Sequence, residues 1–214
     1  MKVVIFGATG MVGQGALRES LLAPDVEHVL AVVRRPTGIR HPKLHEVTLA
    51  DFTDLAPIEA DLAGHDACFY CLGVSALGRD EAAYTRICYD YPVAAARTLA
   101  KLNPDSTFVY VSGAGTNTNG RAMWARVKGR TENAVIEILP NGYAFRPGII
   151  QPTFGAKSST GWYNVVYAAT APLIPVLQRI APKYVTTTDR LGRAMLRAAR
   201  TGFPTRIVEN RDLR

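Results

Sequence analysis

Three glycines near the N-terminus constrain the fold of this 214-residue chain more than any other feature. Gly7, Gly10 and Gly13 stand between two segments of different character. The short β-branched run Lys2–Phe6 precedes them, and the helically spaced segment Met11–Leu22 begins directly after the second glycine. Such a strand–turn–helix unit needs glycine for the tight turn, for close approach of a ligand to the backbone, and for close helix–strand packing. The unit therefore predicts the first strand and helix of a dinucleotide-binding fold.

Apolar runs and helically spaced segments continue to alternate as far as residue 146. The further predicted strands are Val26–Val33, Leu44–Leu49, Ala67–Leu72, Thr107–Ser112 and Tyr143–Arg146. The further predicted helices are Leu55–Leu62, Glu81–Leu102 and Arg121–Leu139. Continuous apolar strands alternating with helices indicate a parallel sheet covered on both faces, with right-handed crossovers. We expect an α/β Rossmann fold, a doubly wound parallel sheet in three α/β/α layers, with ligands at the carboxyl ends of the strands.

The alternation ends after Pro147. Gly148–Gly161 has the composition of a loop, and the apolar segment Trp162–Leu177 is too short and too interrupted by proline to span a membrane. Whether that segment faces a core, a partner or a membrane surface is left open. Arg190–Arg200 predicts a last helix. We expect one domain over residues 1–214, in which residues 150–200 form a small C-terminal lid on the substrate side.

The phosphate-binding loop and the end of the second predicted strand favour one cofactor. The predicted contacts of the loop, through backbone N–H groups and the positive end of the helix dipole, are Gly7, Thr9, Gly10, Met11, Val12 and Gly13. Arg34 and Arg35 follow the second strand about twenty residues after the loop, where NAD-binding proteins carry a carboxylate. Guanidinium groups match the 2′-phosphate, so NADP(H) is favoured over NAD(H), unless both arginines are merely solvated. Asp51 and Phe52 either flank the adenine or belong to a loop without that role.

Composition and charge exclude several other classes of protein. The chain is 48% hydrophobic and 20% charged, as folded soluble proteins are. Cys68 and Cys71 lie in a predicted strand and point to opposite faces, so we interpret them as core thiols in a reducing, cytoplasmic compartment. The net charge of +7 is concentrated in the second half, but no nucleic-acid motif accompanies it, so we expect no nucleic-acid partner. No metal site is expected, because the histidines lack ligand spacing and are predicted to be surface or loop residues: His28, His41, His45 and His65.

Three motifs together resemble the short-chain dehydrogenase/reductase superfamily, in its extended or atypical branch. They are the glycine triplet, the run Val111–Gly115 at the end of the fifth predicted strand, and the run Phe145–Gly148. The run Trp124–Glu132 is similar to the Tat-interacting-protein subgroup. The resemblance covers almost the whole chain.

The resemblance implies a catalytic constellation that lacks one member. In this superfamily a serine orients the substrate, a lysine holds the nicotinamide ribose, and a tyrosine one helical turn before the lysine transfers the proton. Ser112 matches the serine and Lys128 the lysine, but the tyrosine position is Trp124. An indole N–H donates a hydrogen bond and has no acceptor. The cofactor contacts that the resemblance also implies are Leu72, Gly73, Val74, Lys128, Pro147, Gly148 and Ile149.

Two functional hypotheses follow. The first is an NADP(H)-binding protein with weak or atypical oxidoreductase activity, or a regulator that responds to cofactor occupancy. The second is an active NADPH-dependent reductase of a carbonyl, quinone or flavin, in which another group such as Tyr163 supplies the proton. Trp124 either fills space or lines the substrate pocket. The small-molecule substrate is not identified, and a homodimer is left open.

Overall fold

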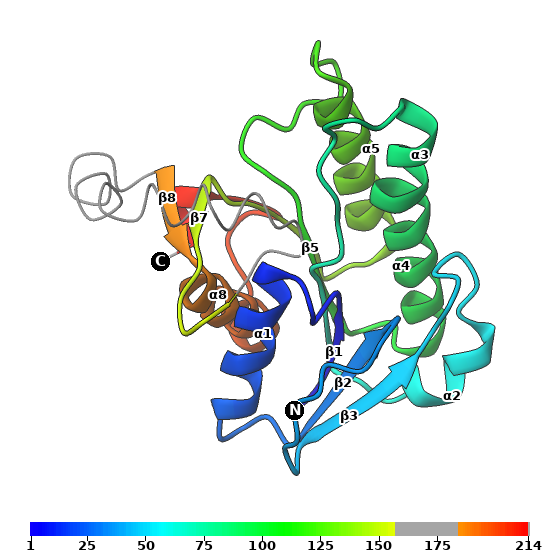
Figure 1. Ribbon diagram of the computed structural model, residues 1–214, viewed down its shortest axis with the longest axis vertical. Coiled ribbons are helices and arrows are strands. Elements are labelled where there is room, and N and C mark those ends of the chain that lie inside the picture. The colour runs from blue at the N-terminus through cyan, green and yellow to red at the C-terminus, as the bar shows by residue number, and fades with distance from the viewer. Residues whose placement is uncertain (157–183, 214) are drawn as a thin grey trace.

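The glycine-rich turn joins the first strand of a seven-stranded parallel sheet to its first helix (Figure 1). The computed structural model describes residues 1–156 and 184–213. The strands of the sheet are β1 (Lys2–Phe6), β2 (His28–Val33), β3 (Leu44–Thr48), β4 (Ala67–Tyr70), β5 (Thr107–Val111), β6 (Gly142–Arg146) and β9 (Ile207–Glu209). Their order is β3-β2-β1-β4-β5-β6-β9, and every neighbouring pair is parallel. The order reverses between β1 and β4, which confirms the doubly wound Rossmann fold.

Helices cover both faces of the sheet (Figure 1). The helical segments are α1 (Met11–Leu22), the 3₁₀ turn η1 (Ala56–Ile58), α2 (Glu59–Leu62), α3 (Glu81–Thr85), the π-helical turn η2 (Arg86–Asp90), α4 (Tyr91–Leu102), α5 (Met123–Ile138), α8 (Thr188–Thr201) and the 3₁₀ turn η5 (Asn210–Asp212). Side chains of α1 and α8 share one buried cluster with the strands, and side chains of α2, α4 and α5 share another. Central strands such as β1 and β4 are buried between the two clusters, which explains their continuous apolar sequences, whereas the edge strand β3 is mostly exposed.

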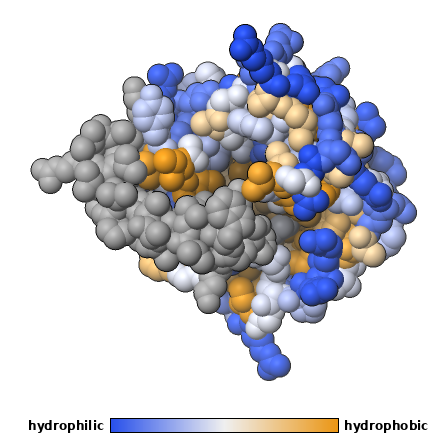
Figure 2. All heavy atoms as spheres, turned by 45° about the horizontal axis from the view of Figure 1, so that its top comes forward, coloured by the Kyte–Doolittle hydropathy of each residue, from blue (hydrophilic) through white to orange (hydrophobic). Residues whose placement is uncertain are grey.

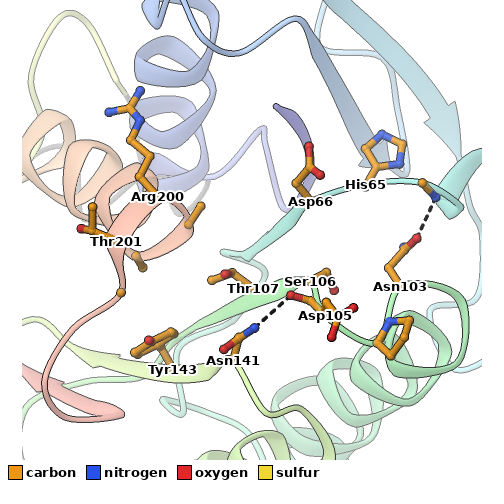
Figure 3. Close-up of a pocket in the computed structure, with 15 residues that line it drawn as sticks. His65, Asp66, Asn103, Asp105, Ser106, Thr107, Asn141, Tyr143, Arg200 and Thr201 are labelled. Atoms are coloured by element: carbon orange, nitrogen blue, oxygen red, sulfur yellow. Dashed lines mark hydrogen bonds between the residues drawn. The ribbon is translucent and has the colours of Figure 1, made fainter.

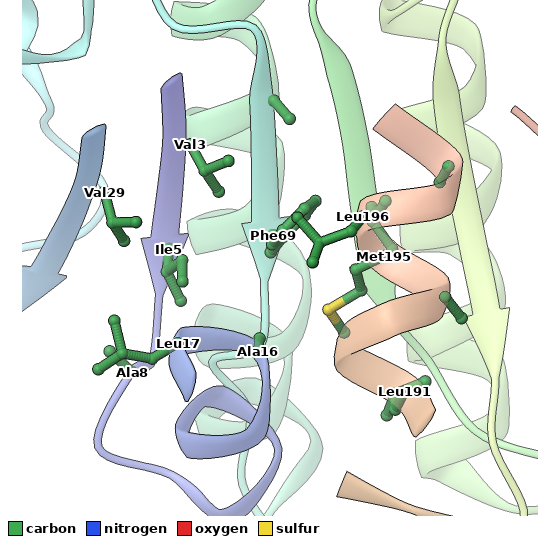
Figure 4. Packing of buried hydrophobic residues seen from close by; sticks show 14 of the residues in the cluster. Val3, Ile5, Ala8, Ala16, Leu17, Val29, Phe69, Leu191, Met195 and Leu196 are labelled. Atoms are coloured by element: carbon green, nitrogen blue, oxygen red, sulfur yellow. The ribbon is translucent and has the colours of Figure 1, made fainter. Parts of the chain in front are cut away.

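Helices α1 and α8 lie side by side because each has a glycine at the contact. A Cβ atom at Gly15 would lie 2.4 Å from the carbonyl oxygen of Thr188, and one at Gly192 would lie 2.8 Å from the carbonyl oxygen of Gly15. Beyond this contact, Leu191 and Met195 of α8 belong to the same buried cluster as Ala16 of α1, beside the sheet (Figure 4). The last helix of the predicted lid therefore belongs to the helical layer. Residues 157–183, which include Tyr163 and Trp162–Leu177, lie outside the described residues.

Three short strands were not predicted. Strand β7 (Ile149–Gln151) lies within the segment predicted to be a loop and pairs in parallel with β8 (Val185–Thr187) in a separate two-stranded sheet. Strand β9 pairs with β6 and ends the main sheet. Each has three residues, which is too short for a period-two pattern to be recognised. Their positions depend on pairing with strands far away in the sequence.

The predicted helix Glu81–Leu102 is interrupted by the π-helical turn η2. The carbonyl oxygen of Cys88 in this turn accepts hydrogen bonds from the hydroxyl groups of Tyr110 (3.3 Å) and Thr131 (2.7 Å). Side chains of β5 and α5 thus satisfy a carbonyl that the widened turn leaves available. The local sequence contains no signal for this arrangement.

The structure confirms the prediction for the two cysteines and shows contacts among the histidines that were not predicted. Cys68 packs in the cluster with α4, and Cys71 packs against the cluster with α1, so the two thiols lie on opposite faces as predicted. His65 lies in the loop between α2 and β4, in line with the prediction of surface or loop residues, but its side chain is buried, with 6% exposed. Its Nε2 lies 3.2 Å from Nδ1 of His28, whose ring stacks on that of His45.

The described helices contain no segment long and apolar enough to cross a membrane.

Candidate functional site

A cleft of about 670 Å³ opens at the carboxyl ends of the strands, where β1, β2 and β4 lie side by side. Eight predicted cofactor contacts line it: Gly7, Thr9, Gly10, Arg34, Arg35, Phe52, Leu72 and Gly73. Five further lining residues were not predicted: Val32, Val33, Pro36, Ala50 and Cys71. Each of the five lies within two positions of a predicted contact in the sequence, so a wider window at the strand ends would have found them. Figure 2 brings this end of the molecule forward and shows hydrophobic residues gathered toward the middle of the face, with hydrophilic residues at its outer rim.

Backbone geometry explains the glycines of the loop. Gly7 has a φ of +79°, and a Cβ atom there would lie 2.6 Å from the backbone nitrogen of Leu72. A Cβ atom at Gly13 would lie 2.0 Å from the carbonyl oxygen of Gly7, which accepts a 2.9 Å hydrogen bond from the N–H group of Gly10. Glycine at these positions allows the turn to fold against both β4 and α1.

The N-terminus of α1 is suited to an anion. No side chain caps the helix, and its first turn contains no acidic residue. The first N–H groups of a helix have no partner within the helix, and the helix dipole places positive potential beside them. Met11, Val12 and Gly13 form this first turn, directly behind the lining residue Gly10. A pyrophosphate in the cleft would receive these donors.

The wall formed by the ends of β2 and β3 combines basic and aromatic groups. Arg34 and Arg35 are exposed, and neither forms an ion pair within residues 1–156 and 184–213. Phe52 is 2% exposed and its ring meets that of Phe6 edge-on at 6.2 Å. Phe52 therefore supports the wall from within the core, while the two arginines are free to bind an anion.

Asp51 does not line the cleft. Its Oδ1 accepts hydrogen bonds from the backbone N–H (2.9 Å) and the hydroxyl group (2.7 Å) of Thr53, and its Oδ2 lies 3.5 Å from Nη2 of Arg86. The hydrogen bonds from Thr53, with the nearby charge of Arg86, lower the pKa of Asp51. This carboxylate is occupied by its own turn and by a neighbouring helix.

Ser112 and Lys128, which the resemblance placed together, meet at the end of β5. The Lys128 ammonium donates hydrogen bonds to the carbonyl oxygens of Val111 (3.2 Å) and Ser112 (3.0 Å). Burial lowers the pKa of Lys128 from its ordinary value. The hydroxyl oxygen of Ser112 lies 3.0 Å from that of Thr116, a neighbour that sequence reasoning missed. A second hydroxyl residue four positions after Ser112, in the same glycine-rich loop, was the available signal.

Trp124 packs with both the loop and the helices around it. Its ring edge would lie 3.6 Å from a Cβ atom added at Gly115, and the ring contacts the buried cluster of Tyr84, Cys88 and Val127. Trp124 is partly exposed. The position that the resemblance gives to a tyrosine therefore carries a partly exposed aromatic ring that packs near Gly115 and brings no hydroxyl group.

The segment after β6 adjoins the same end of the sheet. The carbonyl oxygen of Pro147 accepts a 2.9 Å hydrogen bond from the N–H group of Ala114, and the N–H group of Gly148 donates to Oδ1 of Asn210 at 2.9 Å. Ile149 is 49% exposed. The predicted contacts that do not line the described cleft are Met11, Val12, Gly13, Asp51, Val74, Ser112, Lys128, Pro147, Gly148 and Ile149.

A second cavity, of about 580 Å³, lies at the opposite end of the sheet (Figure 3). Its polar groups serve the turns that precede the strands. Asn103 accepts a hydrogen bond from the N–H group of Gly64 (2.7 Å), and Asn141 donates one to the carbonyl oxygen of Asp105 (2.9 Å). Among its described lining residues, none belongs to a glycine-rich turn or a helix N-terminus, so the cleft at the carboxyl ends is the candidate site. No cluster of three or more His, Cys, Asp or Glu residues that could hold a metal ion occurs within the described ranges.

Comparison with known proteins agrees with this geometry. Residues 7–137 match a family described as NAD(P)H-binding. The chain belongs to this family. The chain is also 31% identical over 151 residues to protein FMP52-2, mitochondrial, of Scheffersomyces stipitis, a match that spans 68% of this chain and 65% of that protein. It is 22% identical to protein FMP52, mitochondrial, of Meyerozyma guilliermondii, over 92% of this chain and 84% of the relative.

Solved structures support the same fold. The Bordetella bronchiseptica enzyme WbmF, solved in complex with NAD+, superposes with a TM-score of 0.70 at 16% identity, over 99% of this chain and 76% of that one. At this identity the likeness shows the fold alone. With the family match, it confirms the predicted dinucleotide-binding Rossmann fold.

One prediction is overturned. The thiols led us to expect a cytoplasmic protein, but the two relatives above are named as mitochondrial proteins. The reasoning failed because buried thiols indicate a reducing compartment and do not distinguish one such compartment from another.

Proposed function

We propose that this chain binds NADP(H) in the cleft at the β1–β4 switch point, and that it is a weak or atypical oxidoreductase or a cofactor-dependent regulator. The observation that carries the cofactor preference is the pair Arg34 and Arg35 on the cleft wall, exposed and without an ion pair to any described residue. A guanidinium matches phosphate oxygens in charge and geometry. The carboxylate nearest in sequence to this wall, Asp51, is engaged by Thr53 and Arg86, so it does not offer the ribose-binding group of an NAD site.

The weak or atypical activity rests on position 124. In the enzymes that this chain resembles, a tyrosine at this position transfers the proton. The indole of Trp124 has no proton-transfer chemistry near neutral pH. Its packing against Gly115 and Val127 supports a space-filling role. Ser112 and Lys128 remain at the end of β5, which supports retained cofactor binding.

Isothermal titration calorimetry with NADPH and NADH tests the cofactor preference. We expect Arg34→Ala to weaken NADPH binding roughly 10- to 100-fold, because hydrogen bonds to a charged group contribute about 1.5–3 kcal/mol, and to leave NADH binding nearly unchanged. Arg40→Ala is the matched control, since Arg40 is exposed in the following loop and does not line the cleft. Equal losses for NADPH and NADH would contradict the 2′-phosphate assignment.

A second candidate function is NADPH-dependent reduction of a quinone, flavin or carbonyl with a different proton donor. The observation that favours it is the intact arrangement of Ser112 and Lys128 beside the partly exposed aromatic surface of Trp124. NADPH consumption with menadione, FMN and benzaldehyde distinguishes the two functions. Turnover with any of these by the wild-type protein would establish a reductase, whereas tight NADPH binding without turnover would favour the regulator.

Position 124 is tested within the same screen. We expect Trp124→Tyr to keep NADPH affinity within about threefold and to raise benzaldehyde reduction above that of Trp124→Phe, which has the same ring without the hydroxyl group. Equal rates for the two variants would show that substrate geometry is also absent.

A homodimer and the lid before α8 remain parts of the proposal; light scattering of the purified protein tests the first.

A further inference from the structure

Three oxygen atoms form a short chain at the end of β5. The hydroxyl oxygen of Ser112 lies 3.0 Å from that of Thr116, and the Thr116 hydroxyl oxygen lies 2.8 Å from the carbonyl oxygen of Gly113. Ser112 is 6% exposed and Thr116 is 5% exposed. Both distances are those of O–H···O hydrogen bonds, so each contact contains one hydrogen atom.

Counting hydrogens fixes the direction of the chain. The carbonyl oxygen of Gly113 has no hydrogen, so the Thr116 hydroxyl must donate to it. The remaining contact can then be filled only by the hydrogen of Ser112. Ser112 donates to Thr116, and its oxygen keeps lone pairs that accept nothing within the described part of the chain.

The backbone around Ser112 is held on both sides. Its N–H group donates to the carbonyl oxygen of Phe145 at 2.8 Å, and its carbonyl oxygen accepts from the Lys128 ammonium at 3.0 Å. Because both backbone groups of Ser112 are hydrogen-bonded, its hydroxyl group is held in place beside Thr116. Turning its hydrogen toward a ligand would break one hydrogen bond of the chain, because only the Thr116 hydrogen would remain for two contacts.

We propose that Thr116 is a positioning residue that fixes Ser112 as a hydrogen-bond acceptor, so that the ligand group facing Ser112 is a donor, a hydroxyl or an N–H group. This inference rests on the proposed function, because it assigns the ligand class of the same site. An alcohol then binds beside Ser112 in preference to the ketone of the same carbon skeleton. The indole of Trp124, one helical turn before Lys128, adds no acceptor of its own.

A matched pair of probes tests the preference. 1-Phenylethanol and acetophenone share one skeleton and differ in whether the oxygen can donate. Ligand-observed NMR measures the dissociation constant of each for the full chain, alone and with saturating NADPH. We expect the wild-type protein to bind the alcohol about fivefold more tightly, the ratio that one neutral hydrogen bond supplies.

Two substitutions at position 116 separate positioning from folding. Thr116→Val has nearly the same shape and no hydroxyl group, so it frees the Ser112 hydrogen and should remove or reverse the preference for the alcohol. Thr116→Ser keeps the hydroxyl group and should keep the wild-type ratio. Thermal melting of both variants shows whether each is folded. If Thr116→Val does not fold, the ratio for wild type against Ser112→Ala decides, since Ser112→Ala removes the acceptor and should abolish the preference.

The outcomes are distinct from those of the cofactor proposal. Absence of NADPH binding in calorimetry would overturn the proposed function, and the probe ratio in the protein alone would still report on Thr116. Equal binding of the two probes, absence of alcohol binding, or a ratio unchanged in Thr116→Val would overturn the positioning role while leaving NADPH binding intact.

Discussion

Single atoms decide the shape of the phosphate-binding turn. The distance of 2.0 Å between a Cβ atom at position 13 and the carbonyl oxygen of Gly7 is far below any van der Waals contact. The neighbouring atoms belong to the backbone and cannot rotate away. The same cleft also contains Gly73, where a Cβ atom would meet nothing within 4 Å.

These two glycines give a matched prediction. We expect Gly13→Ala to lower the free energy of unfolding by about 2 kcal/mol or more, the cost of forcing extra atoms into a packed region, and to weaken NADPH binding more than tenfold. Gly73→Ala should leave the free energy of unfolding within about 0.5 kcal/mol of wild type. Urea unfolding and calorimetric titration measure both quantities. A stable Gly13→Ala protein with unchanged NADPH affinity would contradict the geometry of the turn.

At the scale of elements, one arginine fastens α5, β6 and β9 together. Arg146 of β6 forms a bidentate pair with Glu132 of α5, at 2.9 and 2.6 Å, and a third contact of 3.2 Å with Glu209 of β9. Glu132 is 1% exposed. The hydrogen bonds with Glu132 and the charge of this carboxylate, and to a lesser extent those of Glu209, raise the pKa of Arg146. The Phe-Arg-Pro-Gly run that supported the family resemblance thus has a structural role at its arginine.

Removal of this arginine should unfold the protein more easily. We expect Arg146→Leu to cost about 3 kcal/mol, because it leaves the Glu132 carboxylate buried without a partner. Glu209→Gln is the matched control and should cost less than about 1 kcal/mol, because Glu209 is 43% exposed. Urea unfolding measures both values. Equal losses in the free energy of unfolding for the two variants would show that the buried pair stabilises the protein no more than the exposed contact with Glu209.

At the scale of the whole molecule, a histidine cluster links stability to mild acid. The Nδ1 atom of His65 lies 3.2 Å from the carbonyl oxygen of Leu62, so it carries the ring hydrogen and leaves Nε2 to accept from His28. Burial lowers the pKa of both histidines below the ordinary value of 6.5, and the nearby charges of His45 and Lys2 lower that of His28 further. The surrounding charges of the opposite sign are Glu27 and Asp66.

The sign of the effect follows from proton binding. Below about pH 6.5 the unfolded chain binds protons that the folded histidines do not, so the free energy of unfolding falls as the pH falls toward their lowered pKa values. Asp189 does not contribute in this pH range, because hydrogen bonds from threonine and arginine side chains lower its pKa from 3.8 to about 2. Urea unfolding at pH 7.5 and 5.5 should show this loss. His65→Gln should reduce it, and His41→Gln, outside the cluster, should not. A loss that is the same in both variants would assign it to other groups.

The sequence by itself determined the elements that have a strong local signal. The alternation of buried strands and amphipathic helices, the glycine turn and the arginines after β2 follow from periodicity and from residue chemistry that acts within a few positions. The bounds of α1, Met11–Leu22, came out as predicted for the same reason. The resemblance added Ser112 and Lys128, whose meeting at the end of β5 no local pattern indicates.

Tertiary structure alone decided the remainder, because it depends on contacts between segments distant in sequence. Strand β9 exists because β6 offers an unpaired edge, and α8 lies beside α1 because Gly15 and Gly192 permit a close approach. The Ser112–Thr116 hydrogen bond depends on how one loop folds back on itself. The histidine cluster depends on register between strands that are neighbours only after folding. Local propensity fixes which elements form, and packing fixes which side chains then meet.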